Sequence, residues 1–124
     1  MSFVDLLLDQ ELLLALAEHE FTQPTAIQQQ AIPPLLEGSN VLASAPTGTG
    51  KTLAFVLPAL QHILDTPRQE AGTPKVLILS PTRELARQTY DQIQQLVTHN
   101  HLKCCLIVGG VPFGMQKAMV AQTI

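Results

Sequence analysis

The feature that most constrains the fold is an apolar run, a glycine-rich loop and a helix-prone run that follow one another without a break. Residues 41–43 are Val-Leu-Ala, and residues 53–57 are Leu-Ala-Phe-Val-Leu. The stretch between them contains Ala45, Pro46, Thr47, Gly48, Thr49, Gly50, Lys51 and Thr52. Its glycines let the backbone turn its N–H groups inward, toward a hollow that also faces the positive end of the next helix dipole. The order predicts a strand, a loop that cradles a polyphosphate, and a helix.

Lys51 and Thr52 carry the chemistry expected of this loop. In phosphate-binding loops the lysine reaches the β- and γ-phosphates, and the hydroxyl that follows takes a position on Mg²⁺. We therefore predict Lys51 and Thr52 as catalytic residues, and Thr52 as a direct or indirect metal ligand. The generic pattern begins with glycine, whereas this chain has Ala45 there. The alternative is a Gly-Thr-rich turn that only joins a strand to a helix.

The composition indicates a small globular domain. The chain has 124 residues, 46% of them hydrophobic, and a formal net charge of −3. That length allows one domain at most. The acidic balance argues against a broad basic surface for nucleic acid, so any such binding must use backbone N–H groups and a few placed cations.

Neither the N-terminus nor the cysteines indicate export. Acidic residues interrupt the N-terminal leucine runs, and no basic residue precedes them, which excludes a signal peptide. Cys104 and Cys105 are adjacent in an apolar run, a pattern that predicts buried or half-buried thiols without a metal site or a disulfide. The expected location is therefore cytoplasmic.

Two further apolar runs predict strands. Residues 75–80 form a continuous β-prone run, typical of a strand covered on both faces, and residues 104–108 form the next one. Strands separated by helices make right-handed parallel crossovers, so the loops after the three strands meet at one carboxyl edge, where ligands of open α/β sheets bind. The predicted fold is α/β, a P-loop NTPase with a RecA-like parallel sheet flanked by helices.

Cap residues and apolar spacing predict four helices. Asp9 caps the first, which ends near Glu20, and Thr25 caps the second, which runs to about residue 37. The third follows the glycine loop from residue 51 to about residue 65, and Thr82 caps the fourth. The histidines at 99 and 101, in a polar turn, are predicted to be solvated.

Arg83 is unusual in the first turn of a helix. A cation there opposes the helix dipole, whereas a docked anion would be held by both the arginine and the free N–H groups. The alternative is that Arg83 pairs with Glu84 or another neighbour, and the two readings rank equally on these grounds. Gly109 and Gly110, after the third apolar run, are an ordinary turn signal.

Three stretches of the chain resemble the DEAD-box RNA helicases. Residues 45–52, with alanine first and Pro46 inside, resemble motif I of that family, and residues 81–86 match its motif Ia. Residues 21–28 resemble its Q motif, although Glu20 departs from the glycine that usually precedes it. By itself Gln28 is only an amide on a helix, but such an amide can pair with the N6 and N7 edge of adenine.

The resemblance implies a nucleotide site and an RNA site, with ATP and Mg²⁺ as cofactors. It implies that Gln28 reads adenine and that an upstream aromatic residue stacks on the base. The ATP-binding residues that it implies are Phe3, Phe21, Thr25 and Gln28, together with Ala45 to Thr52 as named above. The residues that it implies for the RNA backbone are Pro81, Thr82, Arg83, Gly109 and Gly110.

The implied activity is that of an ATP-dependent RNA helicase, which unwinds short RNA duplexes by contacts to the backbone rather than to the bases. The implied partners are ATP, the RNA backbone and a second RecA-like domain, with no membrane. Residues 57–62 resemble a bacterial branch of the family that is linked to ribosome assembly, which adds ribosome-assembly factors to the implied partners.

The acidic residues limit what this stretch can do alone. None of the ten ends an apolar strand, where acids that hold Mg²⁺ and orient water would stand. We expect residues 1–124 to be a partial first RecA-like domain, cut before the Walker B strand, with a Q-motif region over 1–38 and a P-loop core over 39–124. Two alternatives stay open: a nucleotide- or RNA-binding module without turnover, and another superfamily 2 P-loop helicase that acts on DNA.

Overall fold

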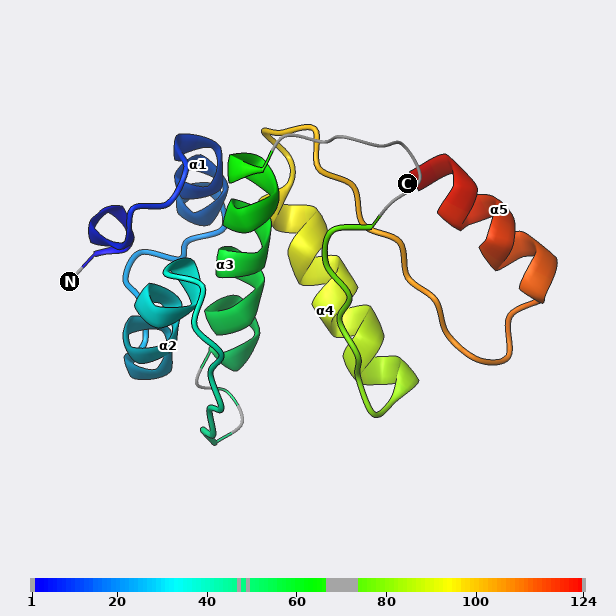
Figure 1. The fold of residues 1–124 in the computed structure, drawn as a ribbon, viewed down its shortest axis with the longest axis horizontal. Helices are drawn as coiled ribbons and strands as arrows, with labels where there is room; N and C mark the ends of the chain where they lie inside the picture. Colours follow the sequence, from blue (N-terminus) through cyan, green and yellow to red (C-terminus); the bar gives the residue numbers. More distant parts are fainter. Residues whose placement is uncertain (1, 47, 49, 67–73, 124) are drawn as a thin grey trace.

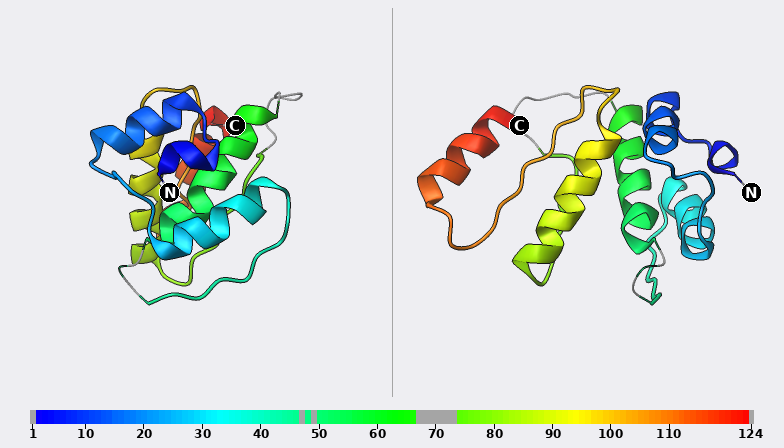
Figure 2. Two further views of the ribbon diagram at one scale, coloured as in Figure 1. Left: turned by 90° about the vertical axis from the view of Figure 1, so that its left-hand side faces the viewer. Right: turned by 180° about the vertical axis from the view of Figure 1, so that it is seen from behind.

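Helices carry the regular structure of this chain. The computed structural model describes residues 2–46, 48, 50–66 and 74–123. Its elements are η1 (Phe3–Leu6), α1 (Gln10–Glu18), α2 (Ala26–Leu36), α3 (Lys51–Asp65), α4 (Arg83–Leu96) and α5 (Phe113–Thr123). Figures 1 and 2 show α3 between the N-terminal helices and α4, with α5 at the far end from the N-terminus.

The predicted helix starts are confirmed, because local side chains satisfy the free N–H groups there. The Asp9 side chain accepts a hydrogen bond from the Glu11 N–H (3.0 Å), and the Thr82 hydroxyl accepts one from the Leu85 N–H (3.1 Å). At the start of α2, the Gln28 side chain reaches back to the Thr25 N–H (2.9 Å), which completes a capping box. The helix predicted to follow the glycine loop also has the expected length, Lys51–Asp65.

The backbone just after α1 shows why glycine would suit position 20. Glu20 has a φ of +62°, the left-handed conformation that normally favours glycine. The Phe21 N–H bonds the Leu16 carbonyl (2.9 Å) and the Glu20 N–H bonds the Ala17 carbonyl (3.1 Å), which is the Schellman pattern. A residue with a Cβ is therefore strained at a position where the backbone suits glycine.

The core joins the N-terminal helices to α3 and α4. Its fully buried side chains include Leu12, Leu16, Ile32, Leu53, Val56, Leu57 and Leu96. Helices α2 and α3 are in contact, and so are α1 and α4. None of the helices in the described ranges combines the length and apolarity needed to cross a membrane.

His99 is not merely solvated, as the sequence suggested. Its Nε2 lies 2.7 Å from the Glu18 Oε1, with the two side chains 34% and 52% exposed. The contact joins the end of α1 to the turn after α4, across 81 residues of sequence. Because both partners are partly exposed, its contribution to stability is about 0–1 kcal/mol.

The segments predicted as strands lie outside helices, but no strand is assigned within the described residues. Residues 76–80 alternate between half-buried and exposed side chains, as an extended chain does. Ile78 packs against the core, whereas Leu77 and Leu79 are 81% and 84% exposed. The expectation that both faces of this segment are covered is therefore wrong for the described structure, because the helices lie against one face only.

Replacing Glu20 with glycine is predicted to stabilise the chain by about 0.5–1 kcal/mol, because glycine adopts the left-handed conformation without the Cβ clash. The matched control is Glu37→Gly, since Glu37 caps α2 with a φ of −80° and gains nothing from the change. Urea unfolding of the two variants measures the difference. Equal effects of both substitutions would contradict the strain at Glu20.

Candidate functional site

The glycine loop ends where α3 begins. Gly50 precedes Lys51 with a φ of +84°, and Gly48 has a φ of +82°. Lys51 is exposed at the first position of α3, and Thr52 beside it is half-buried. The free N–H groups of this first turn, with the lysine beside them, suit an anion. The predicted residues Thr47 and Thr49 lie outside the described residues.

Gln28 connects α2 to the glycine loop. Its side chain is 2% exposed; Oε1 accepts the Thr25 N–H (2.9 Å) and Nε2 donates to the Gly50 carbonyl (3.1 Å). Both ends of the amide are thus engaged with the protein. Sequence reasoning predicted a base contact for Gln28 and missed this bond, because nothing local relates residue 28 to residue 50.

Gly50 is required by space as well as by conformation. A Cβ added there would overlap the Gln28 Nε2 and would lie 3.0 Å from the Thr25 Oγ1. The same addition at Gly48 meets nothing within 4 Å. The two glycines share a positive φ, but of the two only Gly50 lies against side chains from the start of α2.

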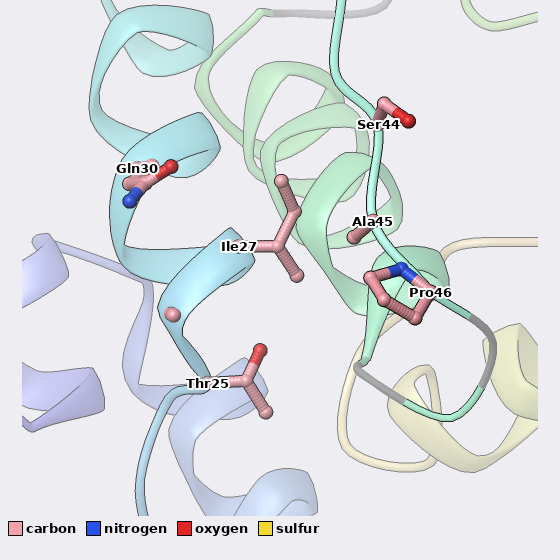
Figure 3. A pocket seen from close by; sticks show the side chains of 7 residues that line it. Thr25, Ile27, Gln30, Ser44, Ala45 and Pro46 are labelled. Carbon is pink, nitrogen blue, oxygen red and sulfur yellow. The ribbon is translucent and has the colours of Figure 1, made fainter.

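A cavity of about 390 Å³ lies between α2 and the segment that leads into the loop (Figure 3). Its lining residues are Thr25, Ala26, Ile27, Gln30, Ser44, Ala45 and Pro46. Figure 3 shows Ile27 pointing from α2 toward Ala45. Its volume lies within the range of small-molecule pockets, about 300–1,000 Å³. Three of the predicted residues line it, whereas Ala26, Ile27, Gln30 and Ser44 were missed.

The two predicted aromatic residues lie away from this cavity. Phe3 is 5% exposed and belongs to the hydrophobic core, and Phe21 packs against that core. Neither lines the cavity beside the loop. The structure therefore brings Thr25, Gln28 and the glycine loop together and leaves Phe3 and Phe21 in the helical core.

A second pair of predicted segments meets at the start of α4. An added Cβ at Gly110 would lie 2.9 Å from one terminal guanidinium nitrogen of Arg83 and 3.4 Å from the other, so the guanidinium lies directly on this glycine. Gly110 has a φ of +84°. Within the described part of the chain Arg83 forms no ion pair with Glu84. The arginine and the glycine turn therefore form one surface, with Pro81 and Thr82 exposed beside it.

Gln116 braces that glycine turn, and sequence reasoning missed it. Its Oε1 accepts the Val108 N–H (2.7 Å), and its Nε2 donates to the Val111 carbonyl (3.4 Å). Both bonds span the residues around Gly109 and Gly110, so α5 holds the turn in shape. A smaller cavity of about 240 Å³ lies next to it, lined in part by Arg87, Tyr90 and Gln116.

Lys51 at the start of α3 and Arg83 at the start of α4 are cations beside the two glycine loops. Among the described residues, no three His, Cys, Asp or Glu side chains are grouped to hold a metal. Thr52 could thus contribute one oxygen to Mg²⁺, which would need the remaining ligands from phosphates and water.

Burial, followed by the neighbouring Cys105, raises the pKa of the half-buried Cys104 thiol, which makes it a poor nucleophile.

Gly50→Ala is predicted to detach Gln28 from the loop, because the new methyl group occupies the place of the amide. The expected loss of unfolding free energy exceeds that of Gly48→Ala, which carries the same left-handed strain of about 1–2 kcal/mol without the overlap. Urea unfolding measures the loss, and the NMR signals of the Gln28 side-chain amide report the broken bond. If Gly48→Ala proves as costly and the amide signals stay in place, the predicted overlap is wrong.

Comparisons with known proteins extend over most of the chain. The model of the DEAD/DEAH box helicase family matches residues 25–124. The chain is 57% identical over 112 residues to the ATP-dependent RNA helicase SrmB of Escherichia coli, covering 90% of this chain and 25% of that protein. It is 48% identical over 121 residues to the ATP-dependent RNA helicase drs1 of Neosartorya fischeri, covering 98% of this chain and 15% of that protein.

Solved structures are also similar. A DEAD box protein from Methanococcus jannaschii has a TM-score of 0.82 at 38% identity, over 96% of this chain and 32% of that chain. The RNA helicase Prp28 from Chaetomium thermophilum, bound to ADP, has a TM-score of 0.79 at 35% identity, over 89% and 27%. The chain thus spans a quarter or less of these curated relatives and about a third or less of these solved chains.

Proposed function

Because this chain belongs to the DEAD/DEAH box helicase family, we propose that it serves an ATP-dependent RNA helicase as the part that binds ATP and holds the RNA backbone. One observation carries the proposal: the buried Gln28 amide joins the start of α2 to the glycine loop through Gly50. The start of α2, which is suited to recognising a base, and the glycine loop, which is suited to binding phosphates, thereby form one unit. Such a unit would recognise a whole nucleotide rather than a phosphate alone.

The nucleotide is proposed to lie along the loop, with its phosphates at Lys51 and the first turn of α3. The Thr52 hydroxyl would help to hold Mg²⁺, which would supply the positive charge that a polyphosphate needs. To read adenine, Gln28 would use the second N–H of Nε2 and the second lone pair of Oε1, which its bonds to Gly50 and Thr25 leave over. Stacking by Phe3 requires a conformational change, because this side chain is buried against the core. We propose that η1 moves when the base binds.

The RNA backbone is proposed to lie on Pro81, Thr82, Arg83, Gly109 and Gly110. Support comes from the contact between the Arg83 guanidinium and Gly110, which combines a cation, the free N–H groups of α4 and a surface without a side chain. The net charge of −3 fits recognition by such a local site rather than by a broad basic surface.

The proposed function includes a parallel sheet beneath the two loops. Residues 41–43, 75–80 and 104–108 are proposed to be strands of a RecA-like parallel sheet. The alternating exposure of residues 76–80 and the TM-scores of 0.82 and 0.79 support it. The Q-motif region over 1–38 and the P-loop core over 39–124 are its proposed divisions. A second RecA-like domain, ribosome-assembly factors and a cytoplasmic location complete the proposal for the whole protein.

A second candidate function is a binding module without turnover. It is favoured by the lack of a metal-holding group of acidic side chains among the described residues. Such a module would bind adenine nucleotide and RNA by the same contacts and would leave hydrolysis to acids supplied from elsewhere. A helicase of the same superfamily that acts on DNA would share Lys51 but would have no need for 2′-hydroxyl contacts.

Lys51→Ala is predicted to weaken the binding of ATP at least about tenfold, which corresponds to about 1.4 kcal/mol. The fold should persist, because Lys51 is exposed and contacts solvent rather than the core. Titration with a fluorescent ATP analogue and Mg²⁺ measures the affinity, and Lys75→Ala serves as the matched control, since Lys75 is also exposed. ATP affinity unchanged in Lys51→Ala would refute the phosphate site.

Arg83→Gln is predicted to weaken the binding of single-stranded RNA to a similar degree for all sequences. The slope of log K against log salt concentration should fall by about 0.7, because one phosphate contact is lost. Arg87→Gln removes the same charge one turn further along α4, at a residue that lines the cavity beside the glycine turn, whereas the nearest atoms to Gly110 belong to Arg83; it should leave most of the slope. Fluorescence anisotropy at several salt concentrations decides, and equal effects of the two substitutions would speak against the Arg83 site.

A further inference from the structure

Gln61 is a buried polar side chain on α3, remote from the glycine loop. It is 5% exposed, and among the described residues only Gln28 is also both polar and buried. The Gln61 Oε1 accepts the Asp9 N–H (2.6 Å), and its Nε2 donates to the Asp65 carboxylate (2.9 Å). A buried amide needs such partners, so this side chain holds Asp9 against α3 across 52 residues of sequence.

Asp9 is fixed from two sides at the start of α1. Its side chain caps that helix by accepting the Glu11 N–H (3.0 Å), whereas its own N–H precedes the helix and donates to Gln61. Helix α3 begins at Lys51, about 15 Å along the axis from residue 61. The start of α1 and the turn suited to phosphates are therefore fixed to the same helix.

Leu7, two residues before Asp9, has a strained backbone. Its φ of +62° and ψ of +34° lie in the left-handed region, which a leucine rarely occupies because its Cβ crowds the following carbonyl. Leu7 ends η1, and its N–H donates to the Val4 carbonyl (3.3 Å). Rotation of the backbone out of this region relieves the crowding, so a strained residue beside a fixed one is suited to act as a pivot.

The short helix η1 holds its own shape up to this pivot. The Asp5 carboxylate accepts the Ser2 N–H (2.8 Å) and the Ser2 hydroxyl (3.2 Å), which closes a capping box. These bonds span only three residues and lie within η1 and its cap. Phe3 and Leu6 are the buried side chains of η1. The helix can therefore turn about Leu7 as a unit and carry Phe3 with it.

We propose that Gln61 is a positioning residue for the base of the nucleotide. It pins Asp9, so that η1 turns about Leu7 and brings Phe3 onto the base. The inference rests on the proposed function, in which Phe3 stacks on adenine, and adds the residue that fixes the pivot. Without the bond to Gln61, the start of α1 would move together with η1. The position of Phe3 relative to the glycine loop would then no longer be defined.

A comparison of ATP with inorganic tripolyphosphate, each with Mg²⁺, tests the proposal, because only ATP carries the base. Gln61→Met keeps the length of the side chain and removes both hydrogen bonds. It should weaken ATP binding about tenfold, as loss of a stacked base does, and change tripolyphosphate affinity by less than about twofold. The matched control is Leu96→Ala, which loosens the core at a fully buried residue. It should leave the ratio of the two affinities as in the wild type.

Phe3→Leu shows whether Gln61 acts through the aromatic ring. Residues that act through one contact are not additive, so adding Gln61→Met to Phe3→Leu should cost little further ATP affinity. A further loss of about tenfold would mean that Gln61 acts by another route, and would overturn the proposal.

NMR of the wild type tests the pivot without any substitution, and so remains decisive should Gln61→Met fail to fold by circular dichroism. ATP should shift the signals of residues 3–7 and leave the Asp9 N–H protected from hydrogen exchange, whereas tripolyphosphate should shift none of them. Loss of that protection with ATP would show that Asp9 is not the fixed point.

The failure of this inference differs from the failure of the proposed function. If Gln61→Met weakens ATP and tripolyphosphate equally, or weakens neither, Gln61 has no role in positioning the base, while binding of phosphates at Lys51 stands. If the wild type binds ATP no more tightly than tripolyphosphate, the chain has no base site. The adenine contacts of the proposed function and the role of Gln61 are then both wrong.

Discussion

The candidate site depends on one buried amide. The Gln28 side chain accepts the Thr25 N–H and donates to the Gly50 carbonyl, and it is 2% exposed. A buried amide without partners would cost about 1–3 kcal/mol, so Gln28 can be buried only while α2 begins beside the end of the loop. Gly50 completes the arrangement, because it has the left-handed backbone and no Cβ to displace the amide. One hydrogen-bonded contact thus constrains three positions.

The two loops use the same physical device. At the first, a glycine with positive φ lies against Gln28 of α2, and at the second, Gly110 lies against Arg83 of α4. In both, the missing Cβ lets a polar side chain from a helix start approach the backbone closely. The core holds the first loop through α3, and Gln116 of α5 braces the second. Polar groups and helix N-termini are in this way presented at two places on one chain.

Much of the helical structure and the family could be predicted, whereas the contacts between remote segments could not. The starts of α1 and α4 follow from Asp9 and Thr82, because capping involves residues two or three positions apart. The Gln28–Gly50 bond and the His99–Glu18 contact span 22 and 81 residues, and no local pattern indicates them. The predicted sheet is not assigned among the described residues, since their apolar runs exchange no backbone hydrogen bonds.

The amino-acid order alone determined the helix starts, the glycine loop before Lys51 and the family, because these depend on residues that are neighbours in the chain. Tertiary structure decided that Phe3 is buried in the core and that Gln28 is bonded to Gly50. It also decided that only one face of residues 75–80 is covered, although every residue from 76 to 79 is apolar. The physical reason is that burial depends on which distant surfaces pack against each other. A linear pattern indicates only which residues would gain free energy from being buried.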